Sequence, residues 1–586
     1  MDDANGVPTT EIASSIFDID DTSVLSYSNE EKISRSTNRK SRRRKSRKKT
    51  RSAFRYPVLI IQGLIILLAN VLVLLLFYPG VFAPDSIDSA RMVFTNNYSD
   101  WSPILYTLLI KYLAIDSGNV IFLFIFQILA FSSASMFLLH RLSHSKLVSQ
   151  RLLWATALVL AFWPPFWLNN VLASKDTFFT ITLIYLTATL LPWFLAKKAE
   201  LFSASDYVNL VISAFLVLVS DGKSWFLIGA ILGVLLVIGI LKHLALAKLV
   251  VSALIVVLGC LSFTFGTTYN FSVRSAPDAI KMSVPIQAIG AIYQADGDIS
   301  GFANEQFSKI HDSQFWAEHY HPYFAENLTE QFNDVRLTPF SVGPVTDRIK
   351  FDSDFFGYYV ETCVRNFITC LGAHLNLIKG YFVPMPNVSD SYIYPVISRV
   401  QDDLYINSFD GTLSRSTTMS DTDLLNVYID QVYRFQNIER TGYSIMSFSN
   451  FIYQTNSEVL GWPSTQAVNS IMQTELVKNG LDWFFDNPVL YIYGFLTLFV
   501  LALAKRRNAA ALLMLSVLFY LLALIYTLPS ADFRYIYPIL PILLVALVLI
   551  ISNVPSSSNA SPISEIELNQ SSVDQDEELV VRDEIS

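Results

Sequence analysis

Long apolar segments separated by short polar ones dominate the chain from residue 57 to residue 552. Segments of this length and polarity are typical of membrane-spanning helices. We therefore expect an all-α fold, a polytopic transmembrane bundle of about ten spans. The predicted spans are 57–77, 119–140, 151–168, 172–195, 207–220, 225–241, 248–267, 488–504, 508–528 and 533–552.

One further apolar segment, 103–115, is too short to cross a bilayer. At about 1.5 Å per residue it covers some 20 Å, whereas the hydrocarbon core is roughly 30 Å thick. If it does not cross, the basic connections fall on the same side as the basic N-terminal segment. Because such connections stay in the cytoplasm, we expect both termini to be cytoplasmic. These connections are 140–151, 197–198, 242–248 and 505–507.

Composition supports this class and shows that the charge is segregated. Only 16% of residues are charged and the mean hydropathy is +0.40, whereas soluble domains carry about 25% charged residues. Twelve of the 42 Lys and Arg lie in 35–55, and eight acids crowd into 564–586. Such runs are usually solvated and disordered. We interpret the basic run as a lipid-contacting cytoplasmic flank; nucleic-acid binding is the remote alternative.

These observations predict a linear domain organisation. It comprises a disordered basic cytoplasmic tail (1–56), a transmembrane module (57–267) with a first external loop (78–118), an extracytoplasmic region (268–487), C-terminal transmembrane helices (488–552) and a disordered acidic cytoplasmic tail (553–586). The external region is expected to be mainly helical. Within it, 361–383 is half apolar but interrupted by charges, which indicates an interfacial or cavity-lining helix.

The first external loop carries the best candidate chemistry. Asp85 and Asp88 are three residues apart, so a helix over 85–94 would place them on one face. A carboxylate there can take a proton from an acceptor hydroxyl. Asp85 also follows Pro84 in a typical helix start, and capping alone remains an alternative role. With 103–115, this predicts a loop of interfacial helices that holds a carboxylate site.

Other polar groups fall at the same predicted membrane face. Cations there suit a phosphate or pyrophosphate head group, and Trp101 can stack on a sugar. Charges that snorkel from helix ends, and an aromatic belt, are the simpler explanations. The additional candidates are Lys175, Asp176, Asp221, Lys223, Asp532 and Arg534.

Several common chemistries lack a signature in the sequence. No Walker P-loop, GxGxxG, HExxH or GxSxG motif occurs. His311, His319 and His321 have no metal-ligand spacing, so a divalent metal is unsupported. Cys363 and Cys370 would stand roughly 10 Å apart along a continuous helix, too far to form a disulfide.

Three motifs resemble GT-C-type integral-membrane glycosyltransferases. The first loop, YPG-x₄-D-S followed by SDWSPILYTLLI, is similar to a bacterial branch that reads YPG…D…HP at this place. ASKDTFF and DFRYIYPILP resemble further motifs of the group. The resemblance implies a polyprenyl-phosphate-linked sugar as donor, an external active site and Asp85 as general base, with Asp88 second. This chain has Ser102 where the branch usually has His.

The implied reaction agrees with the residues. A polyprenyl phosphate is a good leaving group, so one base suffices, unlike glycoside hydrolysis, and a single displacement inverts the anomeric carbon. The expected partners are membrane lipid, the lipid-linked sugar and an envelope glycan or polymer acceptor. A polysaccharide polymerase or ligase, and a lipid-linked substrate transporter or flippase, are the alternatives; transporters usually show repeats and broken helices that are not obvious here.

Overall fold

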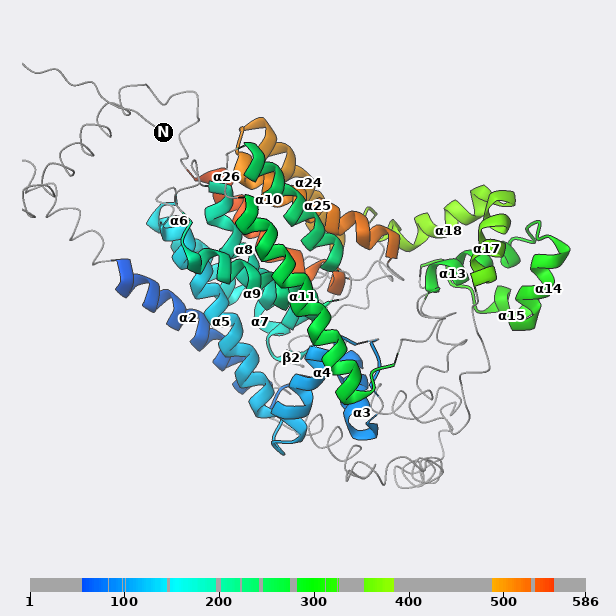
Figure 1. Cartoon of the computed structure of the whole chain (residues 1–586), viewed down its shortest axis with the longest axis horizontal. Coiled ribbons are helices and arrows are strands. Elements are labelled where there is room, and N and C mark those ends of the chain that lie inside the picture. Colours follow the sequence, from blue (N-terminus) through cyan, green and yellow to red (C-terminus); the bar gives the residue numbers. More distant parts are fainter. Residues whose placement is uncertain are drawn as a thin grey trace, which may run out of the picture. The chain divides into compact units, whose positions relative to one another are not determined.

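The computed structural model is mostly helical (Figure 1). It describes residues 55–82, 84–96, 98–100, 102–144, 148–195, 202–221, 224–241, 246–274, 282–310, 312–323, 325, 353–383, 487–527 and 533–552. The chain divides into two units, Met1–Ile61 and Gln62–Ser586. Both predicted terminal tails lie outside the described residues, apart from the first residues of α2.

The predicted apolar segments coincide with helices. Five are long and apolar enough to cross a membrane: Pro57–Leu76, Ile121–His144, Lys175–Leu195, Ala247–Phe271 and Phe533–Ile551. The other apolar stretches of the bundle run for 17 or fewer residues with described side chains. The bundle helices are α2 (Arg55–Leu76), α5 (Ile121–His144), α6 (Gln150–Phe162), α7 (Pro164–Asn169), α8 (Lys175–Leu195), α9 (Ala204–Ser220), α10 (Ser224–Leu241), α11 (Leu246–Phe271), α24 (Pro488–Ala504), α25 (Asn508–Thr527) and α26 (Leu540–Ile551).

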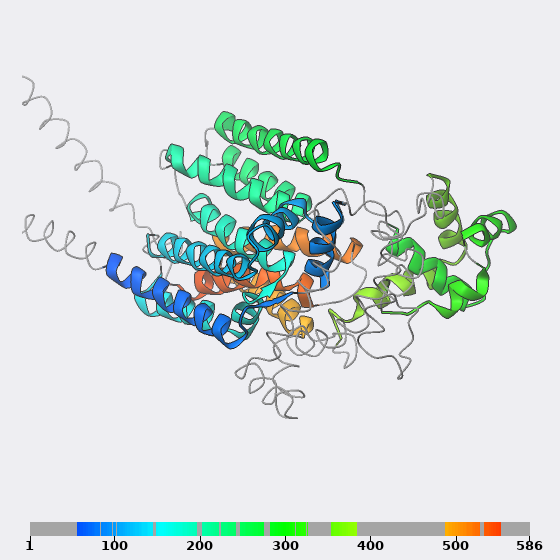
Figure 2. The ribbon, with the colours of Figure 1, turned by 90° about the horizontal axis from the view of Figure 1, so that it is seen from below.

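Helix α8 is the central element. It packs against α5, α9, α25 and α26, and the neighbouring helices run side by side in two perpendicular views (Figures 1 and 2). Its most apolar stretch is 83% buried, whereas that of α11 is 22% buried. A helix apolar all round must be covered by protein or by lipid. In α8 neighbouring helices provide this cover, whereas most apolar side chains of α11 are not covered by the described protein.

Two short helices follow α2, in the segment that the sequence predicted as the first external loop. Helix α3 spans Pro84–Thr95, and α4 (Ile104–Ile110) continues as the π-helical turn η1 (Lys111–Ile115). Together α4 and η1 extend about 18 Å, well short of a bilayer core. Since α3 begins at Pro84, Asp85 lies inside its first turn rather than at the capping position.

The described part of the predicted external region is helical. Its helices are α13 (Ser283–Gln294), α14 (Gly301–Ile310), α15 (Ser313–Glu318), α17 (Ser353–Arg365) and α18 (Phe367–Lys379). Ile286, Ile289, Phe307, Trp316 and Phe355 form a small core between them. These helices therefore have an apolar core of their own.

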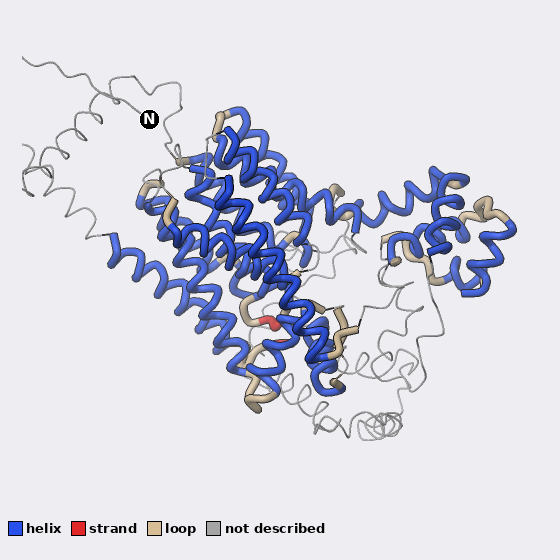
Figure 3. The backbone as a smooth tube through the Cα atoms, viewed as in Figure 1, coloured by secondary structure: helices blue, strands red, loops and turns tan. Residues whose placement is uncertain are grey.

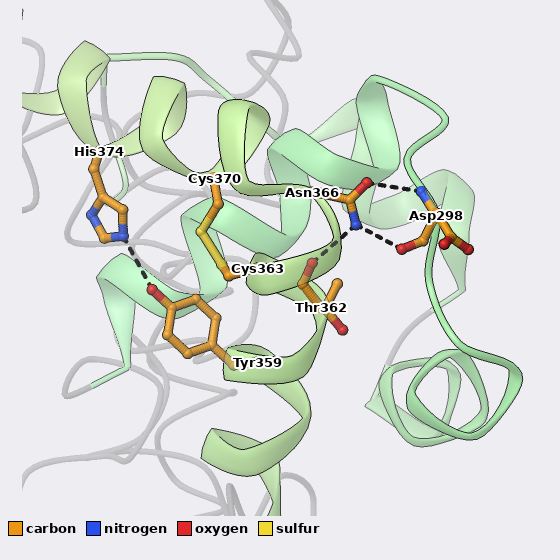
Figure 4. The surroundings of a disulfide bond; sticks show 7 residues. All are labelled: Asp298, Tyr359, Thr362, Cys363, Asn366, Cys370 and His374. Atoms are coloured by element: carbon orange, nitrogen blue, oxygen red, sulfur yellow. Dashed lines mark hydrogen bonds between the residues drawn. A yellow bond between two sulfur atoms is a disulfide. The ribbon is translucent and has the colours of Figure 1, made fainter.

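The expectation that Cys363 and Cys370 cannot pair is wrong. They form a disulfide with their Cα atoms 5.4 Å apart (Figure 4). The estimate assumed one continuous helix, but Asn366 (φ −112°, ψ 43°) interrupts it between α17 and α18. The chain bends there, and both sulfurs come to the inside of the bend.

Candidate active site at the β1–β2 junction

The described residues contain a single sheet, a parallel pair of two-residue strands inside the helical bundle (Figure 3). Strand β1 (Val81–Phe82) pairs with β2 (Leu172–Ala173) in the register Val81↔Leu172 and Phe82↔Ala173. One strand comes from the predicted first external loop, and the other comes from the connection before α8. The pair therefore joins two of the predicted polar segments, and we call it the β1–β2 junction.

The Tyr78-Pro-Gly turn leads the chain from α2 into β1. The Gly80 N–H donates to the Phe77 carbonyl at 2.7 Å, and Gly80 has φ +115°. A Cβ at this position would meet the Phe124 ring. Side-chain-bearing residues rarely adopt such a φ, and here they would also clash, so the turn requires glycine.

Parallel strands bring their carboxyl ends to the same edge, and each strand of the junction runs directly into a helix. Helix α3 begins two residues after Phe82, and α8 begins two residues after its partner Ala173. Asp85 and Asp176 consequently occupy equivalent positions, each three residues beyond a paired strand residue. The junction thus places the first turns of α3 and α8 on the same side of the pair.

Buried hydroxyls fix α3 to its neighbours. Ser86 Oγ donates to the Ala173 carbonyl at 2.5 Å and lies 3.1 Å from the Tyr106 hydroxyl. One turn later, Ser89 Oγ and Ser102 Oγ are 2.8 Å apart. Ser102 therefore ties the start of α4 to α3.

The serine positions also indicate where the candidate acids lie on α3. Ser86 and Ser89 are fully buried, and Asp85 and Asp88 each precede one of them. Successive helical residues are about 100° apart, so the acidic positions fall on the flank of the buried serine face. The side chains of Asp85 and Asp88 lie outside the part of the structure that is described.

Buried amides hold the β2 side of the junction. Gln127 Nε2 lies within hydrogen-bonding distance of the carbonyls of Asn169, Asn170 and Leu172, at 3.3, 3.0 and 3.0 Å. Asn170 Nδ2 donates to Asn70 Oδ1 at 2.7 Å. Buried carbonyls without donors are costly, so these amides from α5 and α2 stabilise the irregular turn that leads into β2.

The start of α8 collects polar groups from several elements. Lys175 and Asp176 are half-buried, and the Asp176 N–H donates to Ser174 Oγ at 3.2 Å. The Asp176 carboxylate interacts electrostatically with the hydroxyls of Tyr520 and Tyr537. Asp221, the residue that ends α9, interacts with the same Tyr520. Two of the predicted acids are thus brought together around one buried phenol.

Sequence analysis missed the phenols of this cluster. Tyr520 and Tyr537 are buried in apolar segments, and Tyr381, just beyond α18, interacts electrostatically with Tyr520. Hydroxyls in apolar helices are visible in a sequence. Which carboxylate each one faces depends on helix packing, so no sequence signal could have assembled the set.

Of the other predicted site residues, the structure describes Arg534 but not Trp101, Lys223 or Asp532. Arg534 lies in the 3₁₀ turn η6 (Phe533–Tyr535), where it donates to the Tyr535 hydroxyl at 2.9 Å; η6 leads into the turn η7 (Tyr537–Ile539). Trp101, Lys223 and Asp532 lie outside the described residues, as does His311. His319 and His321 are described. No group of three potential metal ligands occurs among the residues that the structure covers.

Comparison with known proteins gives no relative for this chain. No protein-family model, no curated protein and no solved structure matches it.

Proposed function

We propose that this chain is a multi-pass membrane glycosyltransferase that moves a sugar from a polyprenyl-phosphate donor to an extracytoplasmic glycan or polymer. The observation that carries the proposal is the β1–β2 junction. It brings a loop with two acidic positions next to the start of α8, where Lys175 and Asp176 stand. A carboxylate base for proton removal and a cation for phosphate are the groups that such a transfer needs.

The proposed chemistry is one displacement. The acceptor hydroxyl attacks the anomeric carbon, its proton passes to Asp85, and the bond from that carbon to the phosphate oxygen breaks. The polyprenyl phosphate leaves with the bond electrons, and Lys175 and Arg534 offset its growing charge. Attack opposite the leaving group inverts the configuration of the sugar.

The apolar helices support a lipid-linked donor. Helices such as α11 expose apolar side chains along their length, including Val250, Leu254, Leu258 and Phe265. Surfaces of this kind are stable against acyl or prenyl chains. In the proposal a prenyl tail lies beside the bundle while its phosphate reaches the junction.

The Cys363–Cys370 disulfide supports an extracytoplasmic location of the region 268–487. Disulfides persist in oxidising compartments and are rare in the cytosol. With the basic connections inside, the proposed arrangement has ten spans, both termini in the cytoplasm and the junction on the outer side. Cysteine labelling at Asp100→Cys, an exposed position of the first loop, should occur from outside; labelling only from the cytosol would contradict the arrangement.

The decisive experiment uses the purified full chain and radiolabelled sugars on polyprenyl phosphate. Wild-type protein should transfer label to an envelope glycan extract, and Asp85→Asn should lower the rate by about 10²-fold or more. Asp116→Asn is the matched control, because Asp116 pairs with Lys111 at 3.0 Å at the far end of η1.

Its outcomes separate the competing functions. Transfer at the wild-type rate by a well-folded Asp85→Asn protein would remove Asp85 as the base. Movement of intact lipid-linked sugar across a vesicle membrane, without transfer, would identify a flippase instead. Transfer of whole oligosaccharide blocks rather than single sugars would identify a polymerase or ligase.

A further inference from the structure

The hairpin formed by α17 and α18 exposes an apolar stripe. On α17 it comprises Phe356, Val360 and Val364; on α18 it comprises Phe367, Ile368, Leu371 and Leu375. The α18 residues Ile368, Leu371 and Leu375 recur at helical spacing, and Phe382 continues them beyond the helix. Val364 and Ile368 are 72% and 79% exposed. They belong to a continuous apolar stripe rather than being isolated apolar residues on a polar surface.

The exposed stripe of α18 is not the face that packs into the core formed by helices α13, α14, α15, α17 and α18. On α18 the buried residues are Cys370, Ala373 and Leu377, which lie on the face opposite the exposed ones. Cys370 and Ala373 pack against α13. Helix α18 is therefore apolar on both faces, and the described protein covers only one of them. A helix with two apolar faces needs a second apolar environment for the face that protein does not cover.

The bend that joins the two stripe segments is held rigidly. The Cys363–Cys370 disulfide closes it, and the Asn366 amide clamps it to the backbone of Asp298 (Figure 4). Asn366 Oδ1 accepts from the Asp298 N–H at 2.9 Å, and its Nδ2 donates to the Asp298 carbonyl at 2.6 Å. The exposed side chains at the bend are thus presented by a fixed backbone.

The end of α18 is tied to the membrane bundle. The Tyr493 hydroxyl donates to the Phe382 carbonyl at 3.3 Å. Tyr493 is the sixth residue of α24, about 8 Å from its start, and begins an exposed apolar stripe that continues through Leu496 and Val500. The hairpin stripe therefore runs into an apolar stripe on a bundle helix, at the end of that helix.

Charged groups border the stripe rather than interrupt it. Arg365 lies at the bend and pairs with Glu361 at 3.1 Å. Lys379 ends α18, with its Nζ 5.9 Å from the Tyr323 ring. Long basic side chains at the edges of an apolar surface are typical of helices lying at a lipid interface, where they reach the head groups.

We propose that this hairpin lies in the membrane–water interface, with the α17–α18 apolar stripe inserted among lipid acyl chains near the head groups. The continuity with α24 selects lipid as the occupant, because the stripe begins where a bundle helix meets the membrane surface. The disulfide and the Asn366 clamp keep α18 flat on the bilayer. The hairpin then serves as an outer-leaflet anchor for the external region.

The test places an environment-sensitive fluorophore at Ile368→Cys in the full chain, with Cys260→Ala as background and no reductant, so that the disulfide stays closed. Leu375→Cys gives a second position on the stripe. Glu305→Cys on α14, 64% exposed in its side chain, is the control. The proteins are placed in nanodiscs whose lipids carry bromine either near the head group or near the bilayer centre.

Both stripe probes should show blue-shifted emission, quenched about twofold by shallow bromines and less by deep ones. The control probe should be unquenched. Unshifted emission at Ile368 would overturn the proposal. A blue shift without quenching would overturn it in favour of coverage by protein, either this chain's own residues 384–486 or a second molecule. Stronger quenching by deep bromines would show a spanning segment.

Discussion

The β1–β2 junction is more polar than its surroundings, whereas the α17–α18 hairpin is more apolar than its surroundings. The junction is a polar, non-helical turn inside an apolar bundle, and buried amides and hydroxyls satisfy its backbone. The hairpin is an apolar surface on a module outside the bundle, and a disulfide fixes its shape. Buried polar groups need specific hydrogen-bond partners, whereas exposed apolar groups need only contact with another apolar surface. The junction is therefore the more sensitive to single substitutions.

The largest effect should come from the turn into the junction. Gly80→Ala should lower the free energy of unfolding by about 3 kcal/mol, because it adds backbone strain and a clash with Phe124. Gly118→Ala is the matched control: φ there is +70°, but a Cβ meets nothing within 4 Å. Its unfolding free energy should fall by about 1 kcal/mol, from the strain of a left-handed φ alone. Equal losses in chemical denaturation would show that packing at Gly80 is unimportant.

Opening the disulfide should affect the hairpin and spare the junction. Cys363→Ser with Cys370→Ser removes a short covalent loop, worth about 2.5 kcal/mol by loop-closure entropy. Hydrogen exchange should accelerate in α17 and α18 while the amides of β1 and β2 remain protected. Cys260→Ala, in a buried position of α11, controls for loss of a thiol. Faster exchange at the junction would mean that the two regions are coupled.

Removing one amide should weaken the junction. Gln127→Leu removes the amide donor of the Asn170 and Leu172 carbonyls, while the Asn169 carbonyl keeps its bond from the Thr177 hydroxyl. The loss should cost about 2 kcal/mol. It should also slow the proposed transfer, since β2 positions the start of α8. Thr156→Val is the control, because that buried hydroxyl donates to the Leu152 carbonyl of its own helix at 2.8 Å. If thermal unfolding shifts equally in both variants, Gln127 has no special role.

The smallest effect concerns acid sensitivity of the hairpin. Burial lowers the pKa of His374, which lies 3.1 Å from the Tyr359 hydroxyl. Its unfolded pKa is the ordinary 6.5, so below that pH the unfolded chain binds a proton that the folded hairpin resists. Stability should thus fall as the pH drops through 6.5 and level off below the folded pKa.

His374→Gln should flatten this dependence in hydrogen-exchange measurements of α18 taken from pH 5 to pH 8. His319→Gln, at the end of α15, is the comparison variant. An unchanged slope in His374→Gln would assign the acid sensitivity to another group.

The sequence by itself determined which segments are helical. Long apolar segments located the bundle helices. The short 103–115 segment followed from its length, and the helix after residue 83 followed from the start signal at Pro84. Sequence also selected Asp85 and Asp176 separately, as acids at the ends of apolar segments. These are local properties, which depend on a residue's own neighbours in the chain.

Only the tertiary structure decided how those segments meet. The parallel pairing that makes Asp85 and Asp176 equivalent joins residues 91 positions apart, as Phe82↔Ala173 shows, and two-residue strands leave no recognisable alternation in sequence. The grouping of Asp176, Asp221 and Tyr520 likewise depends on packing between three helices. Even the Cys363–Cys370 bond required the bend at Asn366. Contacts between distant residues are set by the packing of the whole bundle, which no local pattern encodes.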